Sequence, residues 1–151
     1  MFINKLFKLV LLALFFISLP SAGQEKHHQY VDPMIGSEGL GRVFIGPSYP
    51  FGMVKPSPDC TSSPNSGWLP LPVPLTGFSQ LHVSGTGGGP KHGNIQVMPF
   101  TGPLTETDHS SLRENEQVKL GYYSVILKNN LIKTEITTAN RASFLNLTIK
   151  I

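Results

Sequence analysis

Alternation between apolar and polar residues is the feature that most narrows the folds open to this chain. Residues 145–151 read Leu-Asn-Leu-Thr-Ile-Lys-Ile, apolar at every odd position and polar at every even one. Because successive side chains of a strand point to opposite faces, this pattern predicts a half-buried β-strand. Residues 122–127 and 132–138 are rich in β-forming residues, and the Asn129-Asn130 pair between them predicts a hairpin. With no heptad and no long amphipathic helix, the sequence predicts a largely β chain.

Proline and glycine divide the rest of the chain into short segments. We expect a short strand at 53–55 and a surface loop over 56–64, which holds the only cysteine, Cys60, as an inert thiol. Prolines alternate with apolar residues over 69–75, which predicts extended backbone outside any central strand. The polar stretch 101–117 is expected to be a long loop.

The N-terminus has the pattern of a secretory signal peptide over residues 1–23. Lys5 and Lys8 precede an apolar run over 9–19, and small residues follow it. The run is short for a membrane span, so cleavage is expected and an uncleaved anchor is the alternative. We therefore expect a periplasmic or secreted protein formed by residues 24–151, with no membrane contact beyond the signal peptide.

Charge and composition argue against a nucleic-acid partner, an intramolecular disulfide and a histidine metal site in residues 24–151. Two of the 12 Lys and Arg residues lie in the signal peptide, so ten basic residues face nine acidic ones and the net charge is +1. No basic stripe with interleaved aromatics is present, which argues against nucleic acid. A single cysteine forms no intramolecular disulfide. His27-His28 does not predict a metal site, because neighbouring residues of an extended chain point apart.

The stretch 77–99 is the strongest candidate for a binding surface. It combines His82 and Ser84 with the glycine-rich run Gly85-Thr86-Gly87-Gly88-Gly89. Glycine lets backbone approach a ligand closely, and the histidine and hydroxyls supply polar groups. The alternative is a glycine-rich turn between two strands. The spacing fits neither phosphate-binding glycine motif.

Trp68, the only tryptophan, follows Gly67 in a segment without a strand pattern. A loop tryptophan can serve as a stacking platform for a sugar ring. The alternative is an indole that fills one end of the core. The sequence leaves both interpretations open.

Several ordered motifs together resemble the N-terminal domain of glycoside hydrolase family 92, the calcium-dependent exo-acting α-mannosidases. They are Tyr30-Val31-Asp32-Pro33-Met34-Ile35-Gly36, Pro50-Phe51-Gly52-Met53-Val54, Ser57-Pro58-Asp59, Gly67-Trp68, Gly77-Phe78-Ser79 and His82-Val83-Ser84-Gly85-Thr86-Gly87. Two positions depart from the family pattern: Leu69-Pro70 follows Gly67-Trp68, and Arg42 stands where histidine is common.

The resemblance implies an antiparallel β-sandwich over residues 24–151, incomplete at its C-terminal end, beside a larger (α/α)₆ barrel. In the family the catalytic acid, the base and the calcium site come mainly from that barrel, so no catalytic residue and no metal ligand is expected in this chain. The N-terminal domain supplies one wall of the pocket for an α-mannoside-type glycan. The matching positions are Arg42, Phe44, Trp68, His82, Ser84, Gly85, Thr86 and Gly87.

The prediction is therefore the substrate-pocket domain of an exported α-mannosidase-like hydrolase, inactive by itself. The strand pattern at 145–151 runs to the last residue, so we expect the domain to be a fragment. Two alternatives stay open: a free-standing carbohydrate-binding β-sandwich, and an exported β-protein that pairs with a partner through an exposed edge strand.

Overall fold

A computed structural model describes residues 27–38, 43–49, 51–60, 67–83, 92–104 and 107–149. The chain divides into two compact units, Met1–Tyr30 and Val31–Ile151. The described part of the first unit is one turn of 3₁₀ helix, η1 (His27–Tyr30), with no buried residue. The signal peptide lies outside the described residues. Within the described ranges, no helix has the length and apolar character needed to cross a membrane.

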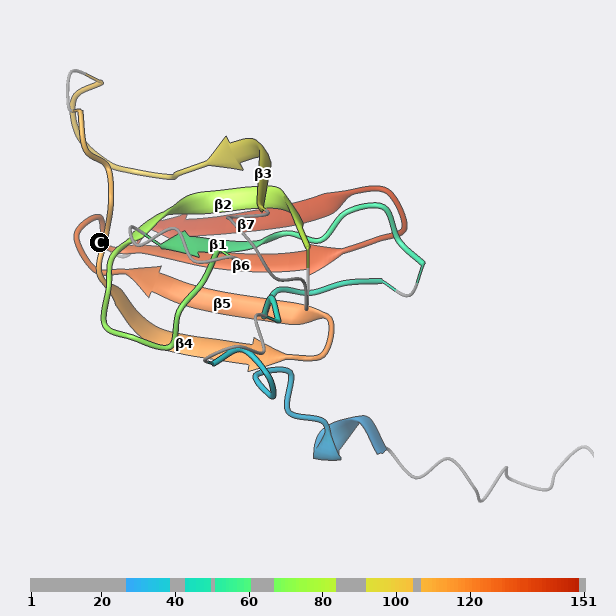
Figure 1. The fold of residues 1–151 in the computed structure, drawn as a ribbon. Coiled ribbons are helices and arrows are strands. Elements are labelled where there is room, and N and C mark those ends of the chain that lie inside the picture. Colours follow the sequence, from blue (N-terminus) through green and yellow to red (C-terminus); the bar gives the residue numbers. More distant parts are fainter. Residues whose placement is uncertain are drawn as a thin grey trace, which may run out of the picture. The chain divides into compact units, whose positions relative to one another are not determined.

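The second unit holds two antiparallel sheets (Figure 1). The smaller sheet has the order β1-β2-β3, with β1 (Ser57–Cys60), β2 (Leu75–His82) and β3 (His92–Val97). The larger sheet has the order β4-β5-β6-β7, with β4 (Arg113–Lys119), β5 (Tyr122–Leu127), β6 (Ile132–Thr138) and β7 (Ser143–Ile149). The expected antiparallel β-sandwich is confirmed.

The core lies between the inner faces of the two sheets. Phe78 of β2 meets Tyr123 of β5 with ring centroids 6.3 Å apart, and neither side chain is exposed. Because aromatic rings bury large apolar areas, this contact is a main link between the sheets. The buried cluster consists of Ile45, Cys60, Trp68, Leu75, Phe78, Tyr123, Val125, Leu127, Ile132 and Ile136.

The larger sheet follows the sequence pattern closely over its last three strands. The predicted hairpin is β5 and β6, and β7 pairs with β6 from Ser143 to Ile149. The half-burial expected for this last strand is found only in part. Leu145 packs against the core, whereas Leu147 and Ile149 are 46% and 59% exposed. The strand lies at the edge of its sheet, where fewer neighbours cover its inner face.

Three other expectations are wrong. Residues 57–60 are the buried strand β1 rather than surface loop, and Pro58 fits because β1 is an edge strand. Residues 53–55 are not a strand; Lys55 N–H donates one bond to the Gln80 carbonyl. The end of the expected loop 101–117 belongs to β4, whose largely polar sequence hides the strand. The buried Cys60 still fits an inert thiol, because burial raises its pKa.

Candidate functional site

The described candidate residues meet at one end of the smaller sheet. His82 is the last residue of β2, not a loop residue, and the Phe44 ring stacks against it with centroids 6.3 Å apart. Gly67 packs so tightly there that a Cβ would lie 2.8 Å from His82 Nε2. The segments that carry Phe44 and Trp68 are therefore both anchored beside His82. The candidates Arg42, Ser84, Gly85, Thr86 and Gly87 lie outside the described residues.

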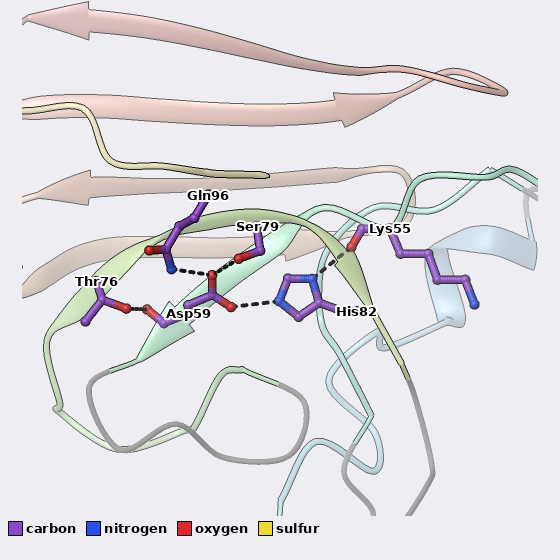
Figure 2. Close-up of polar contacts among 6 residues, drawn as sticks. All are labelled: Lys55, Asp59, Thr76, Ser79, His82 and Gln96. Atoms are coloured by element: carbon purple, nitrogen blue, oxygen red, sulfur yellow. Dashed lines mark hydrogen bonds and ion pairs between the residues drawn. The ribbon is translucent and has the colours of Figure 1, made fainter. Parts of the chain in front are cut away.

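A buried carboxylate organises this end of the sheet (Figure 2). Asp59 of β1 is 1% exposed, and its Oδ1 lies 2.9 Å from His82 Nε2. Its Oδ2 accepts hydrogen bonds from the Ser79 hydroxyl and, at 2.8 Å, from Gln96 Nε2. The second ring nitrogen of His82, Nδ1, lies 2.9 Å from the Lys55 carbonyl oxygen. The Asp59 carboxylate thus links all three strands of the smaller sheet, and His82 extends this link to the segment before β1.

Strand register explains how these polar side chains come together. Ser79 lies opposite Gln96 and Asp59 lies opposite Gly77, so these positions share the face turned away from Phe78. An irregularity in the register between Ser79 and Leu81 brings His82 onto that same face. At Gly77 a Cβ would lie 2.7 Å from Gln96 Cγ, so glycine leaves the space through which Gln96 reaches Asp59.

The hydrogen bonds keep Asp59 ionised despite its burial. Burial alone would raise its pKa, but the bonds from His82, Ser79 and Gln96 and the charge of His82 together lower the pKa below its ordinary value. Both ring nitrogens of His82 lie within hydrogen-bond distance of an oxygen atom, Asp59 Oδ1 and the Lys55 carbonyl oxygen. Asp59, Ser79 and His82 are each 1% exposed. The cluster therefore joins the segments around it through buried hydrogen bonds, and whether His82 also contacts a substrate stays a prediction.

Trp68 lies in the core rather than on an open platform. Its side chain is 1% exposed, and its Nε1 donates to Glu116 Oε1 at 2.9 Å. The Arg113 guanidinium lies 4.9 Å from the centre of the indole ring, and the Tyr123 hydroxyl donates to the same Glu116 oxygen at 2.6 Å. Of the two interpretations of Trp68, this packing supports the core residue.

Sequence reasoning assigned no role to the groups that hold these candidates. Asp59 stood in a family motif, but only the strand register reveals its partners Ser79 and Gln96. Arg113 and Glu116 lay in a stretch expected to be solvated loop. Beside them is a shallow pocket lined by Met34, Trp68, Pro70, Leu71, Pro72, Arg113, Glu114, Asn115 and Glu116.

The described residues do not fit a calcium site. Calcium needs six to eight oxygen ligands, commonly several carboxylates. Across the described ranges, no three His, Cys, Asp or Glu side chains come close enough to hold a metal ion. Among the described residues Asp59 is the buried carboxylate, and its oxygens are occupied by side-chain partners.

Comparison with known proteins gives a consistent result. The model of the "Glycosyl hydrolase family 92 N-terminal domain" matches residues 30–150. An "uncharacterized secreted glycosidase" of Arthroderma benhamiae is 31% identical over 129 residues, which cover 76% of this chain and 16% of that relative. The chain thus spans about a sixth of that relative's length.

Solved structures of a family GH92 α-mannosidase, BT3965 from Bacteroides thetaiotaomicron, share the fold. One matches with a TM-score of 0.75 and 32% identity over 83% of this chain and 19% of that one. A second, in complex with mannoimidazole, matches with a TM-score of 0.72 and 32% identity over 83% and 18% of the two chains. The sequence match, the sandwich and the shared motifs agree, and the chain belongs to glycosyl hydrolase family 92, of which it carries the N-terminal domain.

Proposed function

We propose that this domain forms one wall of the sugar pocket of an exported α-mannosidase-like glycoside hydrolase. The observation that carries the proposal is the buried Asp59–His82 pair, which anchors the segments of Phe44 and Gly67-Trp68 beside the end of β2. The glycine-rich run that contains Ser84, Gly85, Thr86 and Gly87 begins two residues after His82. A rigid support under loops is what a pocket wall needs, because misplaced contacts lose catalytic efficiency.

In this proposal the loop residues contact the glycan, and the buried network only positions them. Phe44 is half-buried and offers part of a ring, while Arg42, Ser84 and Thr86 supply hydrogen-bonding groups. Trp68 acts indirectly, because its ring lies against Arg113 and the core. The acid, the base and the calcium ion come from the larger remainder of the enzyme. The BT3965 structure with mannoimidazole supports a mannoside as ligand, and the secreted fungal relative supports export.

A domain exchange tests the proposal. Residues 31–149 would replace the matching domain of the BT3965 α-mannosidase, and hydrolysis of an aryl α-mannoside would be measured with calcium. We expect the chimera to be active and the isolated chain to show no turnover with or without calcium. In the chimera, Phe44→Ala should lower kcat/KM by about tenfold, which corresponds to the loss of one ring contact. Tyr49→Ala, at an exposed aromatic position in the same segment, is the control.

Two results would contradict the proposal. Turnover by the isolated chain would show that it carries its own catalytic groups. An active, folded chimera whose kcat/KM is unchanged by Phe44→Ala and by Thr86→Ala would show that these loops do not line the pocket. Binding of mannosides by the isolated chain through these loops, with no effect in the chimera, would favour the free-standing carbohydrate-binding module.

A further inference from the structure

The outer face of the larger sheet carries a second cluster of aromatic and polar side chains, separate from the Asp59 network. Tyr122, Thr137 and Phe144 lie directly opposite one another across β5, β6 and β7. Glu135 and Asn146 form a pair one row further along. Their neighbours in sequence, Tyr123 and Ile136, are buried in the core, so these five side chains belong to the opposite face. Together with Ile136 and Leu145 they line a pocket, named here the Phe144 pocket.

The Phe144 ring is the apolar part of this pocket. It is 58% exposed, and Tyr122 beside it is half-buried. Single exposed apolar residues are common on protein surfaces and require no explanation. Here the exposed ring stands next to a group of polar atoms that are already held in place, and this combination is what indicates a binding site.

Glu135 is the centre of the polar part. Its Oε1 accepts hydrogen bonds from the Tyr122 hydroxyl and, at 2.6 Å, from Lys133 Nζ. Its Oε2 accepts one from Asn146 Nδ2 at 3.0 Å. These donors, Lys133 foremost, lower the pKa of Glu135 to about 2, so the carboxylate is ionised at neutral pH. The cluster is therefore fixed before any ligand arrives, which reduces the entropy lost on binding.

The chemistry of the pocket selects a neutral ligand rich in hydroxyl groups. The Lys133 and Glu135 charges offset each other, so the pocket does not attract an anion through net charge. Beyond the bonds above, the Lys133 ammonium keeps two N–H donors, and the Asn146 amide keeps an oxygen acceptor and a second N–H. A sugar hydroxyl both donates and accepts, and the C–H face of a pyranose matches a flat aromatic ring.

We propose that the Phe144 pocket is a carbohydrate-binding site, which takes one pyranose ring of a neutral oligosaccharide with its C–H face on Phe144 and its hydroxyls on Glu135 and Asn146, while Lys133, which borders the pocket through Glu135, holds that carboxylate in place. The site lies on the larger sheet, whereas the proposed catalytic pocket wall is built on the smaller one. It therefore serves to hold the glycan at a second point and does not depend on the function proposed above.

Saturation-transfer-difference NMR on the full chain tests this site with α-1,2-mannobiose and cellobiose as probes. We expect transfer to at least one of the two sugars, with Phe144→Ala weakening its binding about three- to tenfold through loss of the ring contact. Phe51→Ala is the matched control, because Phe51 is fully exposed but lies outside the pocket. Glu135→Gln provides a second variant, since it keeps the size of the side chain and removes the charge that orders the polar groups. Circular dichroism verifies that each variant is folded.

The proposal fails if neither sugar shows transfer to the folded chain. It also fails if Phe144→Ala and Glu135→Gln bind as the parent does, which would assign any sugar signal to the loops of the smaller sheet. Sedimentation of the parent and Phe144→Ala without sugar provides one more arm. If Phe144→Ala abolishes self-association and leaves sugar binding unchanged, the pocket is a protein contact and the proposal is overturned.

Discussion

At the scale of single residues, the Asp59 carboxylate is the group whose loss should cost most. It accepts hydrogen bonds from Ser79 and Gln96 and pairs with His82; Ser79 and His82 are buried, whereas Gln96 is exposed. Asp59→Ala removes the partner of the buried Ser79 and His82 side chains, which costs about 3–5 kcal/mol for a broken buried pair. Urea unfolding followed by circular dichroism measures the change.

Asp108→Ala is the control for this substitution. Asp108 also accepts a hydrogen bond, from the Ser110 backbone N–H at 2.8 Å, but it lies on the surface. Its loss should therefore change the unfolding free energy far less than the loss of Asp59. If both substitutions lower the unfolding free energy equally, the Asp59 network is not the anchor described here.

Acid pH should weaken the fold through the same kind of group. The pKa of Asp59 lies below its ordinary value of 3.8, and that of Glu135 falls from 4.5 to about 2. A carboxyl group with a lowered pKa stabilises the folded state above its unfolded pKa, and this contribution is lost as pH falls through the folded pKa. The urea midpoint should thus decline as pH falls from about 4.5 to about 2. Glu135→Gln should flatten that decline. If the urea midpoint of the variant falls with pH as steeply as that of the parent, Glu135 is not the group responsible.

At the scale of elements, the loop at Gly67 packs so closely onto the end of β2 that position 67 should tolerate only glycine. A Cβ at Gly67 would lie 2.6 Å from Asp59 Oδ1 and 2.8 Å from His82 Nε2, and the backbone φ of Gly67 is +90°. Gly121 has a φ of +73° with nothing within 4 Å of its Cβ position. Gly121→Ala should therefore cost about 1 kcal/mol for backbone strain alone. Gly67→Ala should cost clearly more, and equal thermal shifts would mean that the loop does not press on the pair.

The sequence predicted some elements well because their own patterns determine them. β5, β6 and β7 alternate or are rich in β-formers, and a turn pair separates the first two. β1 and β4 were missed for a physical reason. β1 contains proline and is buried by its pairing with β2, and β4 has a mainly polar sequence because few of its side chains face the core. The strand structure of β1 depends on pairing with β2, which lies further along the chain, and that of β4 depends on its hairpin with β5 rather than on its own residues.

The candidate site was predicted only in part for the same reason. Phe44 and His82 were recognised by family motifs and do lie together. The bonds of Asp59 to Ser79 and Gln96 depend on strand register and on an irregularity within β2. The sequence left two interpretations of Trp68 open. Its contacts with Arg113 and Glu116 support the core residue, and these two residues lie 45 and more positions further along the chain.

At the scale of the whole molecule, the inner face of β7 is only partly covered. Leu145, Leu147 and Ile149 lie opposite Ile136, Thr134 and Ile132, which are buried, yet the last two positions of β7 are about half exposed. Within the described residues, β7 pairs with β6 and has no strand on its other side. An edge strand without charged residues is a template for pairing with a further strand.

This edge leads us to expect that the isolated chain self-associates at about 10–100 µM, a range in which such edges and apolar patches associate. Leu147→Lys should reduce association, because a charge on the inner face of β7 opposes both strand pairing and apolar contact. Leu120→Lys, at an exposed leucine in the turn between β4 and β5, adds the same charge elsewhere and is the control. Analytical ultracentrifugation measures the outcome. A parent chain that sediments as a single monomer over the whole range would show that the β7 edge is protected, and association that Leu120→Lys reduces as much as Leu147→Lys would place the contact outside β7.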